Sequence, residues 1–478
     1  MASPFSSFLW VILFSFSAFL CPYAHQARET AETHHLIQVS SLIPSSTCNT
    51  SASNKGPKSN GSLEVIHKYG PCFESNKDKE QLVPNHIEIL LQDQSRVNSI
   101  HSRLSNNSSS NKFRDSQAAA TLPAKSGLTI GTGNYIVTVG LGTPKRDLRL
   151  VFDTGSDLTW TQCEPCAISC YNQVDPIFNP SKSTSYSKIA CTSPSCAKLN
   201  SATGNPPQCS STSQCLYLAS YGDQSFSIGY FSQERLTITP SDVLENFLFG
   251  CGQDNEGLFQ GIAGLLGLGR NQISVVQQAA QKYGQFFSYC LPATTSSTGY
   301  LKFGNSGGVS NAVKFTPLLT LSRSASFYGL GLTGISVNGR QLSIPTSAFS
   351  AAGTLIDSGT VITRLPPVAY SELRTAVRAS MRGYPLTSPV SILDTCYDLS
   401  KSMTVLVPRI GFLFGGVSVD LDKAGVFFMV SSSQACLAFA GNNDASKVAI
   451  IGNVQQKRLE VVYDVAGGRI GFGPGGCS

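Results

Sequence analysis

From about Gly133 to the end of the chain, most apolar residues lie in short runs bounded by glycine and proline. β-branched and aromatic residues are common in these runs, a composition typical of β-strands. Asn338 and Gly339 form a dipeptide that favours a two-residue hairpin turn. The predicted strands cover residues 134–142, 148–156, 217–223, 235–240, 246–252, 299–304, 327–339, 353–360, 417–421 and 459–465. We therefore predict an all-β protein over this part of the chain.

Helical patterns are few. The best candidates downstream are residues 273–283 and 370–381. Upstream, apolar residues between Ile87 and Val97 recur with the spacing of an amphipathic helix.

The start of the chain resembles a secretory signal. Residues 8–20 form an apolar run of 13 residues, which is shorter than the roughly 20 that a bilayer-spanning helix needs. Ala24 and Ala27 offer small residues for cleavage. We therefore predict a signal peptide over residues 1–24 and secretion to the apoplast, with the vacuole or the chloroplast as alternatives. No later segment predicts membrane association.

Residues 25–125 differ in composition from the rest of the chain. They hold all six histidines and stretches rich in serine, asparagine and lysine. They also hold the N-glycosylation sequons at Asn49, Asn60, Asn106 and Asn107. We interpret this segment as a prosegment that is removed by cleavage between about Phe113 and Gly133. The alternative is a glycosylated extension that stays attached.

The amino-acid composition of the chain excludes several classes of function. The chain of 478 residues is 41% hydrophobic and 13% charged, with a formal net charge of +6. Lysine and arginine are scattered, so nucleic-acid binding is not predicted, and we expect a monomer. With no histidine after His101, the downstream chain cannot use Ser-His-Asp or Cys-His catalysis.

The cysteines favour an oxidising compartment. The chain has 15, and the 12 from Cys163 onward are an even number that six disulfides would use. The cluster Cys163, Cys166 and Cys170 begins with a C-x-x-C spacing, which leaves an all-cysteine zinc site as an alternative. Disulfides are the better interpretation for a secreted chain.

An internal repeat organises the β region. The segment 150–156 (LVFDTGS) matches 354–360 (TLIDSGT), and Asp153 and Asp357 occupy equivalent positions 204 residues apart. Each copy is followed by two apolar residues and a glycine, at 265–267 and 450–452. We expect two β lobes, each supplying one aspartate to a cleft between them.

These motifs resemble those of the pepsin-like aspartic proteases over about residues 133–473. The cysteine pattern and its insertion at 163–215 resemble the plant nepenthesin type, and the chain is also similar to chloroplast-nucleoid DNA-binding proteases. The resemblance implies a bilobal fold of two β-barrel-like lobes with the active site in the cleft between them. The expected lobes are residues 126–320, which include the insertion, and residues 321–478.

The resemblance also implies roles for the motif residues. Asp153 and Asp357 would be the catalytic pair, and Tyr221 would form part of a lid supported by Trp160. Supporting residues around the pair would be Thr154, Gly155, Ser156, Ser358, Gly359 and Thr360. Two carboxyls held about 3 Å apart cannot both ionise, so one can act as a base and the other as an acid. This chemistry requires no metal and no cofactor.

The predicted function is therefore that of a secreted aspartic endopeptidase, active at acidic pH on polypeptide substrates and inhibited by its own prosegment. The alternatives are a pepsin-like binding or inhibitor protein with weak catalysis, and a plastid DNA-binding protease. Cysteine connectivity does not follow from spacing. The resemblance to nepenthesins implies the pairs Cys163–Cys166, Cys170–Cys251, Cys191–Cys215, Cys196–Cys209, Cys290–Cys477 and Cys396–Cys436.

Overall fold

The structure is a computed structural model that describes residues 34–43, 45–49, 61–73, 86–105, 135–221, 225–257, 259, 261–306, 308–322 and 324–477. The expected signal peptide, the sequons at Asn60, Asn106 and Asn107, and the expected cleavage region 113–133 lie outside these residues. Asn49 is described, and its side chain is exposed. No helix of the described part is both long and apolar enough to cross a bilayer.

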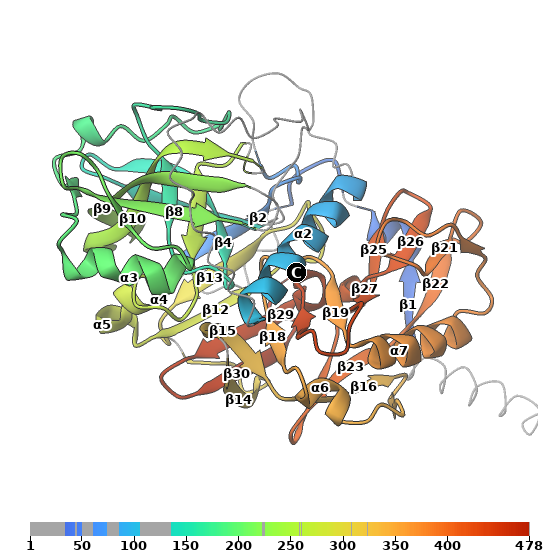
Figure 1. The fold of residues 1–478 in the computed structure, drawn as a ribbon. Coiled ribbons are helices and arrows are strands. Elements are labelled where there is room, and N and C mark those ends of the chain that lie inside the picture. The colour runs from blue at the N-terminus through green and yellow to red at the C-terminus, as the bar shows by residue number, and fades with distance from the viewer. Residues whose placement is uncertain are drawn as a thin grey trace, which may run out of the picture.

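The described chain forms two β lobes, one on each side of helix α2 (His86–Leu104) (Figure 1). The N-terminal lobe is built around the long antiparallel pair β9 and β10. Its strands are β3 (Tyr135–Leu141), β4 (Arg146–Asp153), β5 (Trp160–Gln162), β6 (Ser187–Lys188), β7 (Gln208–Cys209), β8 (Cys215–Ser220), β9 (Phe226–Thr239), β10 (Asp242–Glu256) and β11 (Gly264–Gly267). Its helices are α3 (Pro194–Thr203), α4 (Val275–Gln278) and α5 (Ala280–Tyr283).

The C-terminal lobe has one sheet next to the cleft and two smaller four-stranded sheets. The cleft-side strands are β15 (Ser324–Leu330), β18 (Thr354–Ile356), β19 (Thr363–Leu365), β27 (Phe439–Gly441) and β28 (Ala449–Ile451). One four-stranded sheet contains β16 (Leu332–Val337), β17 (Arg340–Gln341), β23 (Ile410–Phe414) and β24 (Val417–Asp420). The other contains β20 (Leu386–Thr387), β21 (Cys396–Asp398), β25 (Phe427–Met429) and β26 (Gln434–Leu437). Helices α6 (Ser347–Ser350) and α7 (Pro367–Ser380) complete the lobe.

An antiparallel sheet joins the two lobes. Its order is β2 (Ser62–His67), β13 (Gly299–Phe303), β12 (Phe286–Cys290), β29 (Leu459–Asp464), β30 (Arg469–Pro474) and β14 (Lys314–Leu321). The rings of Phe287 and Tyr463 stack across it, with centroids 4.4 Å apart. Because β14 pairs with β30 and β15, the expected lobe boundary at 320/321 falls inside a strand rather than in a connection.

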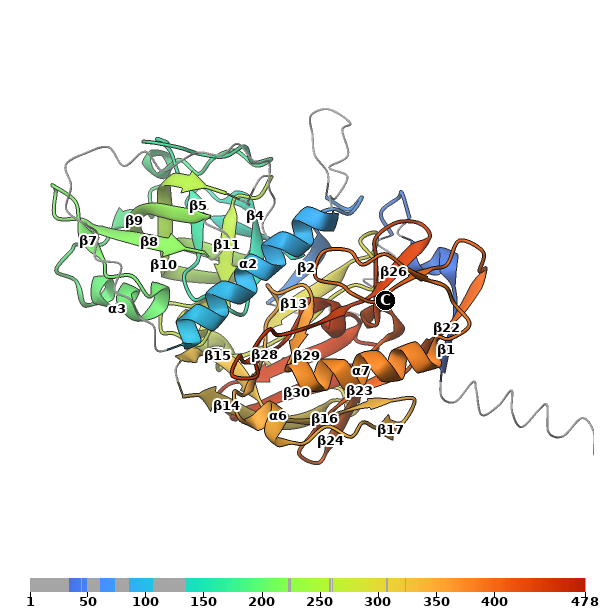
Figure 2. The same ribbon diagram turned by 45° about the vertical axis from the view of Figure 1, so that its right-hand side comes forward.

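The segment upstream of residue 106 is part of this architecture. Strand β1 (His34–Gln38) pairs with β22 (Thr404–Pro408), and β2 pairs with both β13 and β3. Ile37 and Val65 are buried in the main hydrophobic core. Both views place α2 across the front of the molecule between the lobes (Figure 2).

Local sequence explains the elements that the patterns predicted. The Asn338–Gly339 turn joins β16 to β17, and both residues have positive φ angles, as the favoured hairpin turn requires. The predicted helix 273–283 is divided into α4 and α5, with Ala279 between them. The other two predicted helices correspond to α7 and to α2, which extends further than the predicted stretch in both directions.

Seven disulfides join the described cysteines. Two of them, Cys290–Cys477 and Cys396–Cys436, are the pairs that the resemblance implied. Cys48–Cys72 is an additional pair within the upstream segment. The other four expected pairs, Cys163–Cys166, Cys170–Cys251, Cys191–Cys215 and Cys196–Cys209, are wrong. The structure has Cys163–Cys251, Cys166–Cys170, Cys191–Cys209 and Cys196–Cys215 instead.

Tertiary packing explains the difference. Strand β5 runs parallel to β10 with Thr161 opposite Cys251, and this register brings Cys163 beside Cys251. Cys196 on α3 and Cys215 on β8 are both buried in the core of the N-terminal lobe, where they meet. Cys191 and Cys209 lie nearer the surface and pair with each other.

Candidate active site

Each aspartate of the repeat lies at the end of a buried strand. Asp153 is the last residue of β4, and Asp357 directly follows β18. The two apolar-apolar-glycine segments form β11 and β28, which run parallel to β4 and β18. This pairing confirms that both halves of the repeat build the same local structure.

The glycine after each apolar pair is required by a close crossing of two chain segments. A Cβ atom on Gly267 would lie 2.3 Å from the carbonyl oxygen of Asp157. A Cβ atom on Gly452 would lie 2.6 Å from the carbonyl oxygen of Val361. Any larger residue would therefore push the aspartate loop away from its neighbouring strand.

The two carboxylates have equivalent hydrogen bonds. The Ser156 hydroxyl donates to Asp153 Oδ2 at 2.5 Å, and the Thr360 hydroxyl donates to Asp357 Oδ2 at 2.6 Å. The backbone N–H groups of Gly155 and Gly359 donate to the Oδ1 atoms of the same aspartates, at 2.9 Å and 3.2 Å. Each carboxylate is thereby oriented by the residues two and three positions after it.

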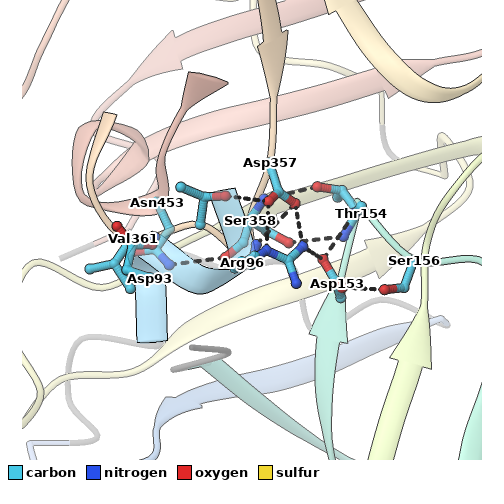
Figure 3. A network of polar contacts seen from close by, with 12 residues as sticks. Asp93, Arg96, Asp153, Thr154, Ser156, Asp357, Ser358, Val361 and Asn453 are labelled. Atoms are coloured by element: carbon cyan, nitrogen blue, oxygen red, sulfur yellow. Dashed lines mark hydrogen bonds and ion pairs between the residues drawn. The ribbon is translucent and has the colours of Figure 1, made fainter. Parts of the chain in front are cut away.

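The two loops also hold each other. The backbone N–H of Thr154 donates to the Ser358 hydroxyl at 3.1 Å, and the backbone N–H of Ser358 donates to the Thr154 hydroxyl at 2.9 Å (Figure 3). Gly155 and Gly359 permit the close approach, because a Cβ atom on either would lie 2.7 Å or less from a carboxylate oxygen of the opposite aspartate. The structure therefore brings the two aspartates and their supporting residues into one buried site.

An arginine from the upstream segment lies between the two carboxylates. Nη2 of Arg96, on α2, donates to Asp153 Oδ1 at 2.6 Å and to Asp357 Oδ1 at 2.9 Å. Its Nε donates to Asp357 Oδ2 at 2.9 Å. The sequence patterns did not identify Arg96. The only signal is that it is a basic residue within the amphipathic stretch 87–97.

The surroundings shift the pKa values of the two carboxyls in opposite directions. Burial raises the pKa of Asp153 above its ordinary value, although the Arg96 charge opposes this effect. Burial acts in the same sense on Asp357, but the charge and hydrogen bonds of Arg96 outweigh it and hold its pKa below the ordinary value. Titratable partners whose pKa values diverge can serve as an acid and a base.

Trp160 and Tyr221 lie beside the aspartates in the N-terminal lobe. The indole N–H of Trp160 donates to the Tyr221 hydroxyl at 2.7 Å, and the ring of Phe259 packs against both side chains. Tyr221 and Phe259 line a cleft together with Asp153 and with residues of α2 such as Arg96. The structure thus brings both aromatic residues that the resemblance singled out into the neighbourhood of Asp153.

Comparison with known proteins assigns the family. Residues 135–305 match the family described as Xylanase inhibitor N-terminal, and residues 327–474 match Xylanase inhibitor C-terminal. An Arabidopsis thaliana protein named as an aspartyl protease family protein is 55% identical over 459 residues, which cover 96% of each chain. The chain belongs to the plant pepsin-like aspartyl protease family.

Other relatives in this aspartyl protease family include Aspartyl protease AED1 of Arabidopsis thaliana, which is 51% identical over 93% of this chain and 92% of its own length. Aspartic proteinase nepenthesin-2 of Nepenthes gracilis is 37% identical over 73% of this chain and 78% of its own length. Together these relatives confirm the resemblance that the motifs indicated.

Solved structures confirm the fold. The crystal structure of EDGP has a TM-score of 0.57 and 21% identity, and the match covers 71% of this chain and 91% of that protein. Basic 7S globulin from soybean has a TM-score of 0.57 and 20% identity, with 71% and 92% covered. The aspartyl protease chain therefore has the expected two-lobed, mainly β architecture.

Proposed function

We propose that this protein is an aspartic endopeptidase that uses Asp153 and Asp357 and is made in a latent form. The observation that supports this proposal most strongly is the symmetric pair of buried carboxylates, one from each lobe, bridged by a single nitrogen of Arg96. One nitrogen can reach both carboxylates only if their oxygens converge on one point. A water molecule at that point would contact both carboxylates.

The reaction follows from one proton shared between the two carboxyls. The ionised carboxylate takes a proton from the bound water as its oxygen attacks the peptide carbon, while the protonated carboxyl donates a hydrogen bond to the carbonyl oxygen. The resulting tetrahedral species collapses when the C–N bond breaks and the leaving nitrogen takes up a proton from the pair. Tyr221, held by Trp160, would close over the peptide and exclude water.

Latency follows from the position of Arg96. Its guanidinium occupies the point between the carboxylates where water would be activated. We infer that residues 25–125 act as an inhibitory prosegment, and that removal of α2 activates the enzyme. Seven disulfides support folding in the oxidising secretory pathway, and we propose that the enzyme is secreted and works at acidic pH.

Substitution of the two aspartates tests the catalytic proposal. Asp153→Asn and Asp357→Asn should each abolish nearly all peptide turnover by the processed protein, and the double variant should be little worse than either one. Asp147→Asn, which changes an exposed carboxylate, is the matched control and should retain activity.

The same experiment separates catalysis from binding alone. The family descriptions that match this chain refer to xylanase inhibitors, so a binding protein on the same fold is the alternative function. If the wild type folds and is processed but has no turnover at acidic pH, the binding function replaces the proposed one. If either aspartate variant retains more than about a hundredth of wild-type turnover, the two-carboxylate mechanism is wrong.

A further inference from the structure

Helix α2 also carries a buried acidic side chain, three residues before Arg96. The Asp93 side chain is fully buried, and three donors of the C-terminal lobe converge on it. The N–H groups of Val361 and Ile362 donate to its two oxygens at 2.6 Å and 3.2 Å, and Nη2 of Arg364 lies 2.9 Å from Oδ2. Figure 3 shows Asp93 beside Val361.

These donors belong to the part of the chain that remains after processing. Val361 and Ile362 directly follow the loop that begins at Asp357, and Arg364 lies on β19. Arg364 is 1% exposed, and its Nη1 donates to the carbonyl oxygen of Ile362 at 2.7 Å. This internal hydrogen bond orients the guanidinium independently of Asp93.

Removal of α2 would leave the donors without their acceptor. In the described part of the chain, Asp93 is the ion-pair partner of Arg364. A buried charge that loses its partner is costly, and two backbone N–H groups would be left unpaired beside it. The site that Asp93 vacates is therefore suited to another carboxylate.

We propose that Arg364 and the N–H groups of Val361 and Ile362 form a subsite for an acidic side chain of the substrate. This inference rests on the proposed endopeptidase function. Residues three apart on a helix are neighbours, with about 5–6 Å between their Cβ atoms, so the Asp93 position lies close to the Arg96 position at the dyad. The acidic side chain should therefore occupy a single position near the bond that is cleaved.

Peptide cleavage by the processed protein tests this subsite. A neutral parent peptide is replaced at one position at a time by Asp or by Asn, and kcat/KM is measured at pH 5. A free Asp side chain, with a pKa of about 3.9, is ionised at that pH. At one position only, Asp should be preferred over Asn by about ten- to hundredfold, the range expected for hydrogen bonds to a charged group.

Substitution of Arg364 tests whether this residue causes the preference for Asp. Arg364→Gln should bring the ratio of kcat/KM for the Asp and Asn peptides, measured within this variant, close to one, and Arg364→Lys should keep part of the preference. Arg469→Gln, which removes an exposed arginine paired with Asp464, is the matched control. If Arg364→Gln does not fold, the position scan is compared between the wild type and Arg364→Lys. A smaller Asp preference in Arg364→Lys supports the subsite, and an unchanged preference contradicts it.

The outcomes distinguish the subsite from the catalytic proposal. Cleavage of the neutral peptides with no position that prefers Asp would overturn the subsite and leave the proposed function intact. A preference that persists in Arg364→Gln would also overturn it. If the processed protein cleaves no peptide, the proposed function fails, and fluorescence polarisation with labelled Asp and Asn peptides decides whether a carboxylate binds at Arg364.

Discussion

Replacement of Arg96 by glutamine should release the catalytic pair in the unprocessed chain. The Arg96 side chain is 13% exposed and makes three hydrogen bonds to the two carboxylates. Glutamine retains polarity and part of the length of the side chain, but it lacks the charge and the forked set of donors. The rest of α2, including its apolar contacts through Val97 and Ile100, is unchanged.

The size of the rate increase follows from the burial of the ion pairs that Arg96 makes with the two carboxylates. Removing one partner of a buried ion pair costs about 3–5 kcal/mol. We take the lower limit, because the two carboxyls can share a proton once the guanidinium is gone. About 3 kcal/mol corresponds to roughly a hundredfold increase in the population with α2 released. The initial rate of peptide hydrolysis by the intact chain should rise by about this factor.

The assay compares initial rates of the intact chains, whose length is verified on a gel at each time point. Arg103→Gln is the matched control on the same helix. Arg103 donates to the carbonyl oxygen of Gly155 at 3.3 Å and packs over the Phe327 ring, so its loss should change the rate by less than about tenfold. After processing, both variants should equal the wild type, because both residues lie in the removed segment. An intact Arg96→Gln chain as inactive as the wild type, but fully active after processing, would refute the proposed role of Arg96.

Three further results are expected. First, the charge and hydrogen bonds of Arg96 hold the pKa of Asp357 below its ordinary value while α2 lies in the cleft, so this carboxyl binds fewer protons in that closed form than after α2 is released. The closed form should therefore be most stable above the ordinary pKa of Asp357 and be lost as pH falls through the lowered pKa. Amide hydrogen exchange of residues 86–104, corrected for its intrinsic pH dependence, should show protection falling with pH, and protection that rises instead would contradict this linkage. Second, burial raises the pKa of Asp157 to about 6, so its ionisation should destabilise the fold as pH rises from about 4 through 6. Asp157→Asn should then raise the free energy of unfolding by up to about 3 kcal/mol at pH 7 and leave it nearly unchanged at pH 4; an equal effect at both pH values would rule this out. Third, peptide mapping without reduction should recover Cys191 linked to Cys209, whereas a link from Cys191 to Cys215 would show that the described pairing is incorrect.

The sequence by itself determined many of the strands, the repeat and the catalytic candidates, because each of these depends on neighbouring residues. An aspartate after an apolar strand, followed by a glycine turn, carries its own hydrogen-bond donors at positions two and three residues further on. The donors of Asp153, Gly155 and Ser156, are such neighbours. The apolar-apolar-glycine segments are distant in sequence, but the repetition of the whole pattern identified them, and the structure pairs them with β4 and β18.

Only the tertiary structure decided the contacts between segments whose patterns carry no information about each other. Nothing in the amphipathic stretch around Arg96 indicates that it crosses the cleft, because helical periodicity reports which face is buried and not what the face packs against. The same reason applies to the partnership of Asp93 with Arg364, across 271 residues of sequence. It also applies to the cysteines of the insertion, where spacing is compatible with several pairings. Register and burial select one of these pairings, since a disulfide forms only where packing brings two sulfur atoms together.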